Sequence, residues 1–294
     1  MYRISIGIAV SMVFLAACGS VDTGHAVVSY EDSIRAWQKH RDEGLRKPDS
    51  WLTLVGLFWL KPGDNTIGSA DDNNFVLPKG SAPPHLGRLR LEGEKVVYMG
   101  TDGSSRALSS DEEKPDIIHA GSLSFYVIKR VDKFAVRVKD SANPVLKHFT
   151  GMKYFPISPE YHLVDAKFIP DSKKIPILNV LGQTEMQESP GIVEFTYKGT
   201  AYRLRPIYEG KTLFFLFKDP TNRSTTYQAG RMLNTPLPSN GKVDLDFNRS
   251  YNPPCTFTPY ATCPLPPKEN ALPFPVEAGE MRYGTGHVPF APSS

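Results

Sequence analysis

Short runs of alternating apolar and polar residues dominate the sequence and predict strands. The clearest hairpin signal is two alternating runs joined by Lys198-Gly199, a pair that suits a tight turn. The strand-like runs cover residues 51–60, 86–99, 123–140, 192–206, 213–217 and 242–247. Because no long helical pattern separates them, we expect a mainly β fold with antiparallel sheets, arranged as a sandwich or a barrel.

One segment near the start has the period of a helix instead. Ile34, Trp37 and Leu45 fall on one face of residues 30–47, and acidic residues precede basic ones, as the helix dipole favours. Pro48 ends the pattern. We therefore expect one N-terminal helix beside the sheets.

The chain divides into four parts. A weak seam near residues 143–158 separates two β-rich halves. The predicted parts are a lipoprotein signal peptide (1–17), a tether (18–28), the helix with a β-rich lobe (29–147), and a second β-rich lobe with a proline-rich C-terminal loop (148–294).

The first residues are typical of an export signal. Arg3 precedes an apolar run from Ile4 to Leu15, which is shorter than the roughly 20 residues of a membrane-spanning helix. The run ends in Leu15-Ala16-Ala17-Cys18, which resembles the lipobox of bacterial lipoproteins. This resemblance implies cleavage before Cys18 and acylation there, palmitate included, with the membrane reached through the lipid anchor. An ordinary signal peptide with a chance cysteine is the alternative.

The predicted location is the bacterial cell envelope. Gly19 follows the cysteine, which is compatible with sorting to the outer membrane, facing the periplasm. Loss of Arg3 with the signal lowers the formal charge from +3 to +2, too small an excess for a nucleic-acid partner. We therefore expect no nucleic acid.

Familiar catalytic and metal-binding patterns are missing from the sequence. There is no G-x-S-x-G, H-E-x-x-H, P-loop or dinucleotide pattern, and the histidines lack metal-ligand spacing. We therefore expect no metal and no cofactor. His148 is a candidate ligand-binding or catalytic residue, with a purely structural role as the alternative.

Cys255 and Cys263 remain once Cys18 is lipidated. In an oxidising compartment they favour a disulfide. Zinc binding, a nucleophilic thiol and two inert buried thiols are the other interpretations.

The stretch from Arg249 to Asn270 holds six prolines in 22 residues and raises the question of what such rigidity serves. Proline lacks an amide N–H and fixes φ, so the stretch must lie across a sheet rather than join one. One interpretation is a site for a small polar or anionic ligand; the other is a rigid cover for an open sheet face. The candidate ligand-binding residues of this stretch are Arg249, Tyr251, Asn252, Tyr260 and Thr262.

A second candidate segment is "TYQAGRMLNTP". Tyr227 and Arg231 lie four apart around Gly230, and Arg231 would add a cation beside Arg249. A salt bridge from Arg231 to an acid such as Asp246 is the alternative.

The motifs "FTGMKYFPI", "YQAGRMLNTPLP" and "DFNRSYNPPCTFTPYATCPLPPKENALPFPVEAGE" resemble the bacterial family DUF 1684, from about Trp37 to Glu280. That family implies no established activity. Residues 66–98 are also similar to the core of forkhead-associated domains, which implies a β-sandwich. The positions of the phosphate-binding side chains are held by Ser69 and Ala82, so phosphopeptide binding is not carried over.

Two functions remain open from the sequence. The first is a membrane-tethered binding module for a small polar or anionic ligand, using the loop from Arg249 to Cys263. The alternative is an enzyme of a type that its motifs do not identify, with a hydrolase as the first candidate. A cavity beside that loop would favour a site, whereas a filled surface would count against both.

Overall fold

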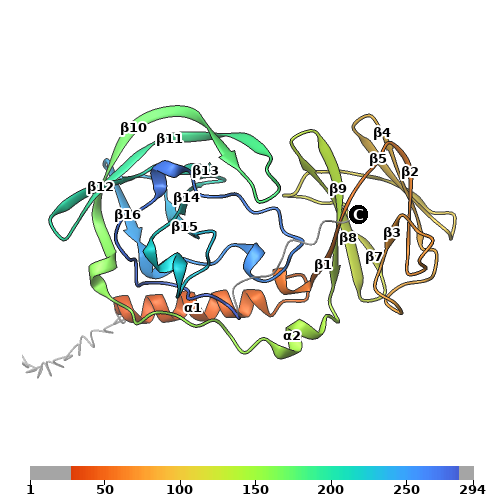
Figure 1. Ribbon diagram of the computed structural model, residues 1–294, viewed down its shortest axis with the longest axis horizontal. Coiled ribbons are helices and arrows are strands. Elements are labelled where there is room, and N and C mark those ends of the chain that lie inside the picture. Colours follow the sequence, from red (N-terminus) through yellow and green to blue (C-terminus); the bar gives the residue numbers. More distant parts are fainter. Residues whose placement is uncertain (1–27, 285–294) are drawn as a thin grey trace, which may run out of the picture.

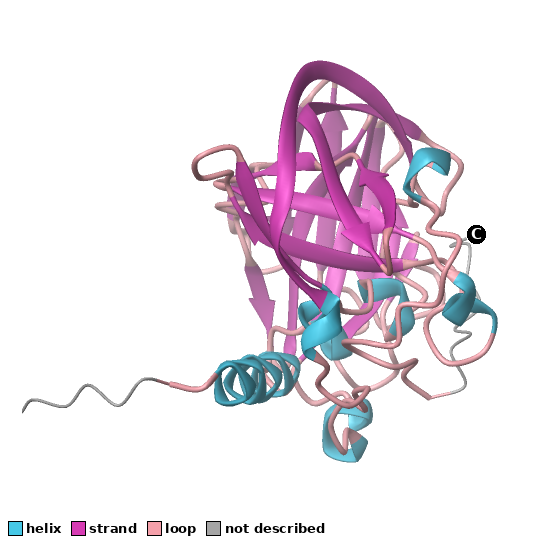
Figure 2. Ribbon diagram, turned by 90° about the vertical axis from the view of Figure 1, so that its left-hand side faces the viewer, coloured by secondary structure: helices cyan, strands magenta, loops and turns pink. Residues whose placement is uncertain are grey.

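A computed structural model describes residues 28–284, and it confirms the mainly β fold with an N-terminal helix (Figure 1). The strands form antiparallel sheets, apart from one short parallel pair, and none of the sheets within the described range closes into a barrel. Most helical segments lie beneath the strands in Figure 2. The predicted signal peptide and Cys18 lie outside the described residues.

The first lobe is a sandwich of two sheets. Its strands are β1 (Leu54–Trp59), β2 (Gly63–Gly68), β3 (Phe75–Val76), β4 (Gly87–Glu92), β5 (Lys95–Gly100), β6 (Ser105–Leu108), β7 (Ile118–Ala120), β8 (Leu123–Arg130) and β9 (Lys133–Asp140). One sheet has the order β3-β2-β4-β5-β6 and the other β1-β9-β8-β7. Ile67 and Leu89 of the first sheet pack with Phe125 and Val136 of the second in one buried cluster.

The sheet β1-β9-β8-β7 is buried on both faces at its centre. Phe125 and Val127 face the sandwich, while the intervening Tyr126 and the following Ile128 face the other way and cluster with Leu57 and Ala135. This outer face points toward the second lobe. It needs a cover, because burying each of its apolar side chains contributes about 1.5–3 kcal/mol to the free energy of folding.

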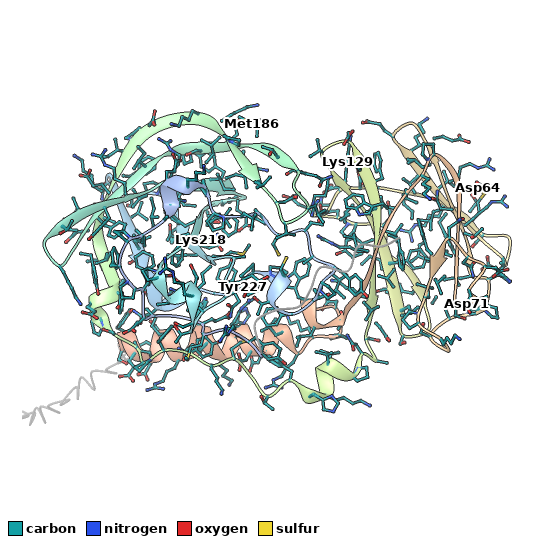
Figure 3. All side chains as sticks on the ribbon, viewed as in Figure 1. Asp64, Asp71, Lys129, Met186, Lys218 and Tyr227 are labelled. Carbon is teal, nitrogen blue, oxygen red and sulfur yellow. The ribbon has the colours of Figure 1, made fainter. Side chains whose placement is uncertain are left out.

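The second lobe is built from a long curved hairpin and a smaller sheet. Its strands are β10 (His162–Leu178), β11 (Thr184–Tyr197), β12 (Thr200–Leu204), β13 (Ile207–Glu209), β14 (Thr212–Phe217), β15 (Arg231–Pro236) and β16 (Lys242–Asp246). The sheet orders are β12-β11-β10-β16 and β13-β14-β15. Phe195 and Phe215 are among the residues that fill the core between them. Met186, on the arch formed by β10 and β11, is exposed (Figure 3).

The hairpin at Lys198-Gly199 is confirmed. Tyr197 pairs with Thr200, and both turn residues have positive φ, 49° and 79°, as a two-residue type I′ turn requires.

The long helix α1 (Tyr30–Leu45) docks on the second lobe, although the predicted partition groups it with the first. Its Tyr30 hydroxyl donates to Asp246 at 2.9 Å, and its Arg41 Nε donates to Glu280 at 2.7 Å. The other α-helix is α2 (Pro144–His148), and 3₁₀ turns occupy Trp51–Thr53, Pro159–Tyr161, Pro220–Arg223, Phe247–Arg249, Pro254–Thr256 and Lys268–Asn270. Within residues 28–284, no helix combines the length and apolar character that a membrane crossing requires.

The proline-rich stretch crosses between the lobes and packs over the outer face of β1-β9-β8-β7. Thr258 Oγ1 donates to the Leu54 carbonyl at 2.9 Å, and the Tyr260 ring packs against the cluster that contains Leu57 and Tyr126. These contacts are those of a rigid cover on an open sheet face.

Candidate functional site

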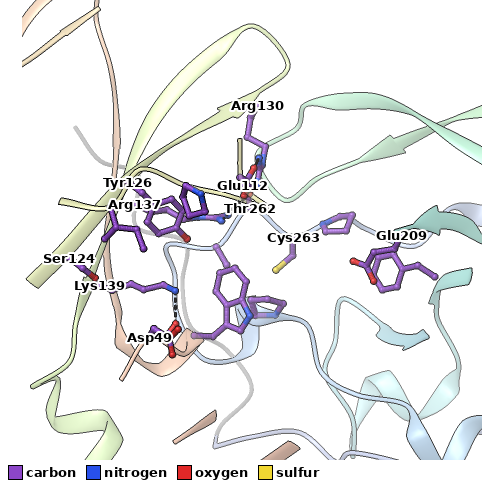
Figure 4. Close-up of a pocket in the computed structure, with 17 residues that line it drawn as sticks. Asp49, Glu112, Ser124, Tyr126, Arg130, Arg137, Lys139, Glu209, Thr262 and Cys263 are labelled. Atoms are coloured by element: carbon purple, nitrogen blue, oxygen red, sulfur yellow. Dashed lines mark hydrogen bonds and ion pairs between the residues drawn. The ribbon is translucent and has the colours of Figure 1, made fainter. Parts of the chain in front are cut away.

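A cavity of about 480 Å³ lies between the two lobes, next to the proline-rich stretch (Figure 4). The outer face of β8 and β9 forms one wall, and residues 261–264 form another. The cations that line it are Arg130, Arg137 and Lys139, and the acids are Asp49, Glu112 and Glu209. The cavity is therefore lined by several charges of both signs.

Arg137 is the most deeply buried charge of this cavity, with 4% of its surface exposed. It lies on β9 between Leu57 and Tyr126 of the adjacent strands, which places it at the centre of the outer face. Its Nη1 donates to Glu112 Oε2 and its Nη2 to Thr262 Oγ1, both at 3.1 Å. The Trp51 ring lies 5.2 Å from the guanidinium carbon.

One nitrogen of this guanidinium is left over. The Nε of Arg137 is buried and has no hydrogen-bond partner within residues 28–284. A buried donor without an acceptor is costly, of the order of 1–3 kcal/mol, and such groups are rare in folded proteins.

Arg130, at the end of β8, converges on the same point. Its Nε donates to Thr262 Oγ1 at 2.8 Å, and both of its Nη groups donate to the Glu112 carboxylate. Burial works against its charge, but Glu112 more than offsets this and raises the pKa of Arg130. Thr262 Oγ1 is therefore shared by two guanidinium groups.

Lys139 adds a third cation on the same face. Its Nζ donates to the Asp49 carbonyl and lies 5.6 Å from the centre of the Tyr126 ring. Burial lowers the pKa of Lys139, with the nearby Asp49 carboxylate acting in the opposite direction.

A second cavity, of about 320 Å³, adjoins the first. The two share Arg130, Glu209, Phe214, Thr262 and Pro264 as lining residues. The charged end of the first cavity is thus open to further space beneath the β10–β11 arch.

Arg249 does not line either of these cavities. Its Nε donates to Asp246 Oδ2 and its Nη2 to Ser33 Oγ, both at 3.2 Å. Arg249 therefore joins the start of the proline-rich stretch to helix α1.

Asn252 and Tyr251 are also engaged within the protein. Asn252 is fully buried, and both its backbone N–H and its side-chain amide donate to Glu280 Oε2, at 2.7 and 3.0 Å. The Tyr251 hydroxyl donates to Asn234 Oδ1 at 2.5 Å. Tyr260 packs in the cover described above.

The candidates of the second segment lie in the interior. Arg231 is buried and donates from Nη2 to Asp219 Oδ2 at 2.8 Å, so it forms a salt bridge inside the protein as the alternative predicted, with Asp219 rather than Asp246 as the acid. Tyr227 is buried beside Cys255. His148 lies exposed at the end of α2, with Nδ1 2.8 Å from the Pro144 carbonyl oxygen.

The two cysteines lie side by side as separate thiols. The Cys255 backbone N–H donates to Cys263 Sγ at 3.1 Å. Hydrogen bonding from Cys263 lowers the pKa of Cys255, whereas burial raises the pKa of Cys263. The structure thus places the two cysteines in contact, and the disulfide stays a prediction. Within the described range, no group of three or more histidine, cysteine or acidic side chains could hold a metal ion.

Of the residues singled out in the sequence, Thr262 and Cys263 line the cavity. The sequence interpretation missed Arg130, Arg137 and Lys139. A signal for Arg137 was present, because it interrupts the buried run Phe134–Val138 at a position where an unpaired cation would be expensive.

The chain matches one family model and several solved structures. No curated protein matches the chain. A solution NMR structure of an uncharacterized protein of Haloarcula marismortui is 28% identical, covers 46% of this chain and 78% of its own, and has a TM-score of 0.38. A family model described as "Protein of unknown function (DUF1684)" matches residues 147–281. The family resemblance seen in the sequence is therefore supported over the second lobe and the proline-rich stretch, as a match to DUF1684.

Proposed function

We propose that the protein binds a small anionic ligand in the cavity between its lobes. The observation that carries the proposal is the convergence of Arg130 and Arg137 on one point of a cavity of about 480 Å³, which Lys139 also lines. Cavities of roughly 300–1,000 Å³ are the usual size for small-molecule sites.

The chemistry of the three cations favours an oxyanion. A guanidinium presents a planar fork of N–H donors that matches a carboxylate or a phosphate. The partnerless Nε of the buried Arg137 supports this, because an acceptor from a ligand would satisfy it. Burial also strengthens such contacts, since the local dielectric is lower than that of water.

The remaining walls favour a ligand that also has an apolar part. Trp51, Tyr126, Ile117 and Phe214 line the same cavity. An aromatic or aliphatic body would pack against them while its acidic group meets the arginines.

A binding role is favoured over a hydrolytic one. Cys263 lines the cavity, but burial raises the pKa of its thiol, which opposes the thiolate that a nucleophile needs. No histidine of the described residues lines either cavity to serve as a base.

The sequence further supports placing this binding protein in the bacterial cell envelope. The Leu15–Cys18 motif would attach it through a lipid on Cys18, with the outer membrane facing the periplasm as the expected site. Small anions in the periplasm would then have access to the cavity.

A thermal-shift screen followed by calorimetry tests the binding role. Phosphate, succinate, citrate and aryl carboxylates would be titrated into the wild type, Arg137→Gln and Arg203→Gln. Arg203 is the matched control, because it is an exposed arginine paired with Glu194 on the far strands of the second lobe. At least one anion should bind the wild type and Arg203→Gln and lose most of its affinity for Arg137→Gln. Equal binding to all three proteins would refute the site.

A further inference from the structure

A carboxylate of the chain itself occupies the cationic end of the cavity. Glu112 accepts hydrogen bonds from both Nη groups of Arg130 and, at 3.1 Å, from Nη1 of Arg137. It thus makes the contacts that the proposed function assigns to a ligand's oxyanion.

Glu112 reaches this point from an exposed connection between β6 and β7, residues 109–117. The base of the connection is fixed in the first lobe, because Asp116 accepts from Arg106 Nη2 at 2.6 Å and from the Ser109 N–H at 2.9 Å. Near the tip, the Glu113 N–H donates to Asp111 at 2.9 Å, which is a contact within the connection. Within residues 28–284, the hydrogen bonds between the tip and the cations of the cavity are those of Glu112.

The Glu112 carboxylate is also placed where it can leave. About a third of its side chain, 36%, is exposed, compared with 5% for the Arg137 side chain to which it is paired. A carboxylate at such a border regains water readily when it departs, whereas the guanidinium cannot.

We propose that Glu112 is an internal stand-in for the ligand's anionic group, and that a bound ligand displaces it. This inference rests on the proposed function of the cavity. The ligand's acidic group is accordingly one that can bind two guanidinium groups at once, a carboxylate or a phosphate.

Displacement follows from the like charges of Glu112 and an anionic ligand. With Glu112 in place, Nη1 and Nη2 of Arg137 each make one of the hydrogen bonds and Nε makes none. A ligand beside Glu112 would meet the remaining N–H groups of Arg137 together with a like charge. A ligand in place of Glu112 meets the forks of both arginines.

An internal competitor lowers the apparent affinity for every external anion. The measured dissociation constant equals the intrinsic one divided by the fraction of molecules in which the site is free. If Glu112 occupies the site in nine molecules of ten, its removal strengthens binding about tenfold.

Calorimetry at constant ionic strength tests the inference, with inorganic phosphate and succinate as the probes. The proteins are the wild type, Glu112→Gln, Glu112→Asp and Glu113→Gln. Glu113 is the matched control, since it carries the same charge on the same connection and takes no part in the contacts to Arg130 and Arg137. Glu112→Gln should bind the better probe about tenfold more tightly than the wild type. Glu112→Asp should fall between them, and Glu113→Gln should match the wild type.

The outcomes separate the two proposals. If the wild type binds a probe and neither Glu112 variant binds it more tightly, the stand-in role is wrong and the anion site remains. If Glu113→Gln gains as much as Glu112→Gln, general charge is the cause and the stand-in role is again wrong. If no protein of the series binds either probe, the anion site itself fails. Glu112→Asp keeps the charge and decides the matter should Glu112→Gln fold poorly.

Discussion

Arg137 of β9 donates from Nη2 to Thr262 Oγ1 at 3.1 Å, across 125 residues of sequence. The same oxygen accepts from Arg130 Nε at 2.8 Å. One hydroxyl of the proline-rich stretch therefore holds two cations of the first lobe in place. The rigidity of that stretch has a specific use here, because it fixes an acceptor opposite the buried Arg137 and the half-buried Arg130.

Removal of this hydroxyl should destabilise the protein. Thr262→Val leaves two charged donors without their acceptor and should lower the free energy of unfolding by about 2 kcal/mol. Thr256→Val is the matched control, because the Thr256 hydroxyl is equally buried yet has no hydrogen-bond partner within residues 28–284. That variant should change stability by less than about 0.5 kcal/mol. Urea denaturation measures both, and similar losses in the two variants would contradict the assignment.

Arg249→Lys should affect stability and leave anion binding intact. The change removes a planar fork that joins Asp246 to Ser33 of helix α1 and should cost about 1 kcal/mol. Thermal unfolding checks the first part, and calorimetry with the anion found in the screen checks the second. A loss of anion affinity at unchanged stability would show that Arg249 takes part in binding.

Alkaline conditions should destabilise the protein through its buried tyrosines. Burial raises the pKa of Tyr161 to about 12. The proton is therefore held more tightly in the folded state, so the contribution of Tyr161 is complete below the unfolded pKa of about 10 and is lost as the pH rises from 10 to 12. Tyr161→Phe should flatten the decline of the urea midpoint over that window. Tyr208→Phe, at an exposed ring, is the control and should leave the slope unchanged.

Cys255 and Cys263 should be joined in the exported protein. Their side chains share one buried cluster, and a bond between them would close a loop of nine residues and add about 2–3 kcal/mol of stability. Alkylation of the unfolded, unreduced protein followed by mass measurement decides the matter. Two added groups would show that the thiols are free.

Cys18 should carry the lipid that anchors the protein. The warrant is the Leu15-Ala16-Ala17-Cys18 sequence at the end of a short apolar run. Cell fractionation should place the wild type with the membranes and Cys18→Ser with the soluble proteins. An equal distribution of the two proteins between the membrane and soluble fractions would contradict the lipid anchor.

The fold was largely readable from local pattern. Strand alternation has a period of two residues, so the hairpin around Lys198-Gly199 and the strand pair within residues 123–140 could be read without knowledge of their neighbours. The N-terminal helix could likewise be predicted from its local sequence. The surface on which it docks could not, because Asp246 and Glu280 lie more than 200 residues away in sequence.

The site was much harder to find, since it depends on which polar residues line a cavity. Arg249, Asn252 and Arg231 have the right chemistry for a ligand, but each is paired with an acid of the chain, Asp246, Glu280 and Asp219 respectively. Arg137 looked like one more polar residue of a strand. Its burial follows from the cover that the proline-rich stretch lays over β9, and no local period encodes that.

The docking of α1 on the second lobe has a mechanical consequence. Arg46, just past the helix, donates from Nη1 to the Phe149 carbonyl at 2.7 Å, and Leu45 packs with Phe149. The chain thus leaves the second lobe and re-enters it at one place, with the whole first lobe nested between these two crossings. Two neighbouring covalent links restrict the relative orientation of the lobes more than a single link would. The backbone itself therefore helps to keep the two walls of the cavity in register, together with the contact of Thr258 with Leu54.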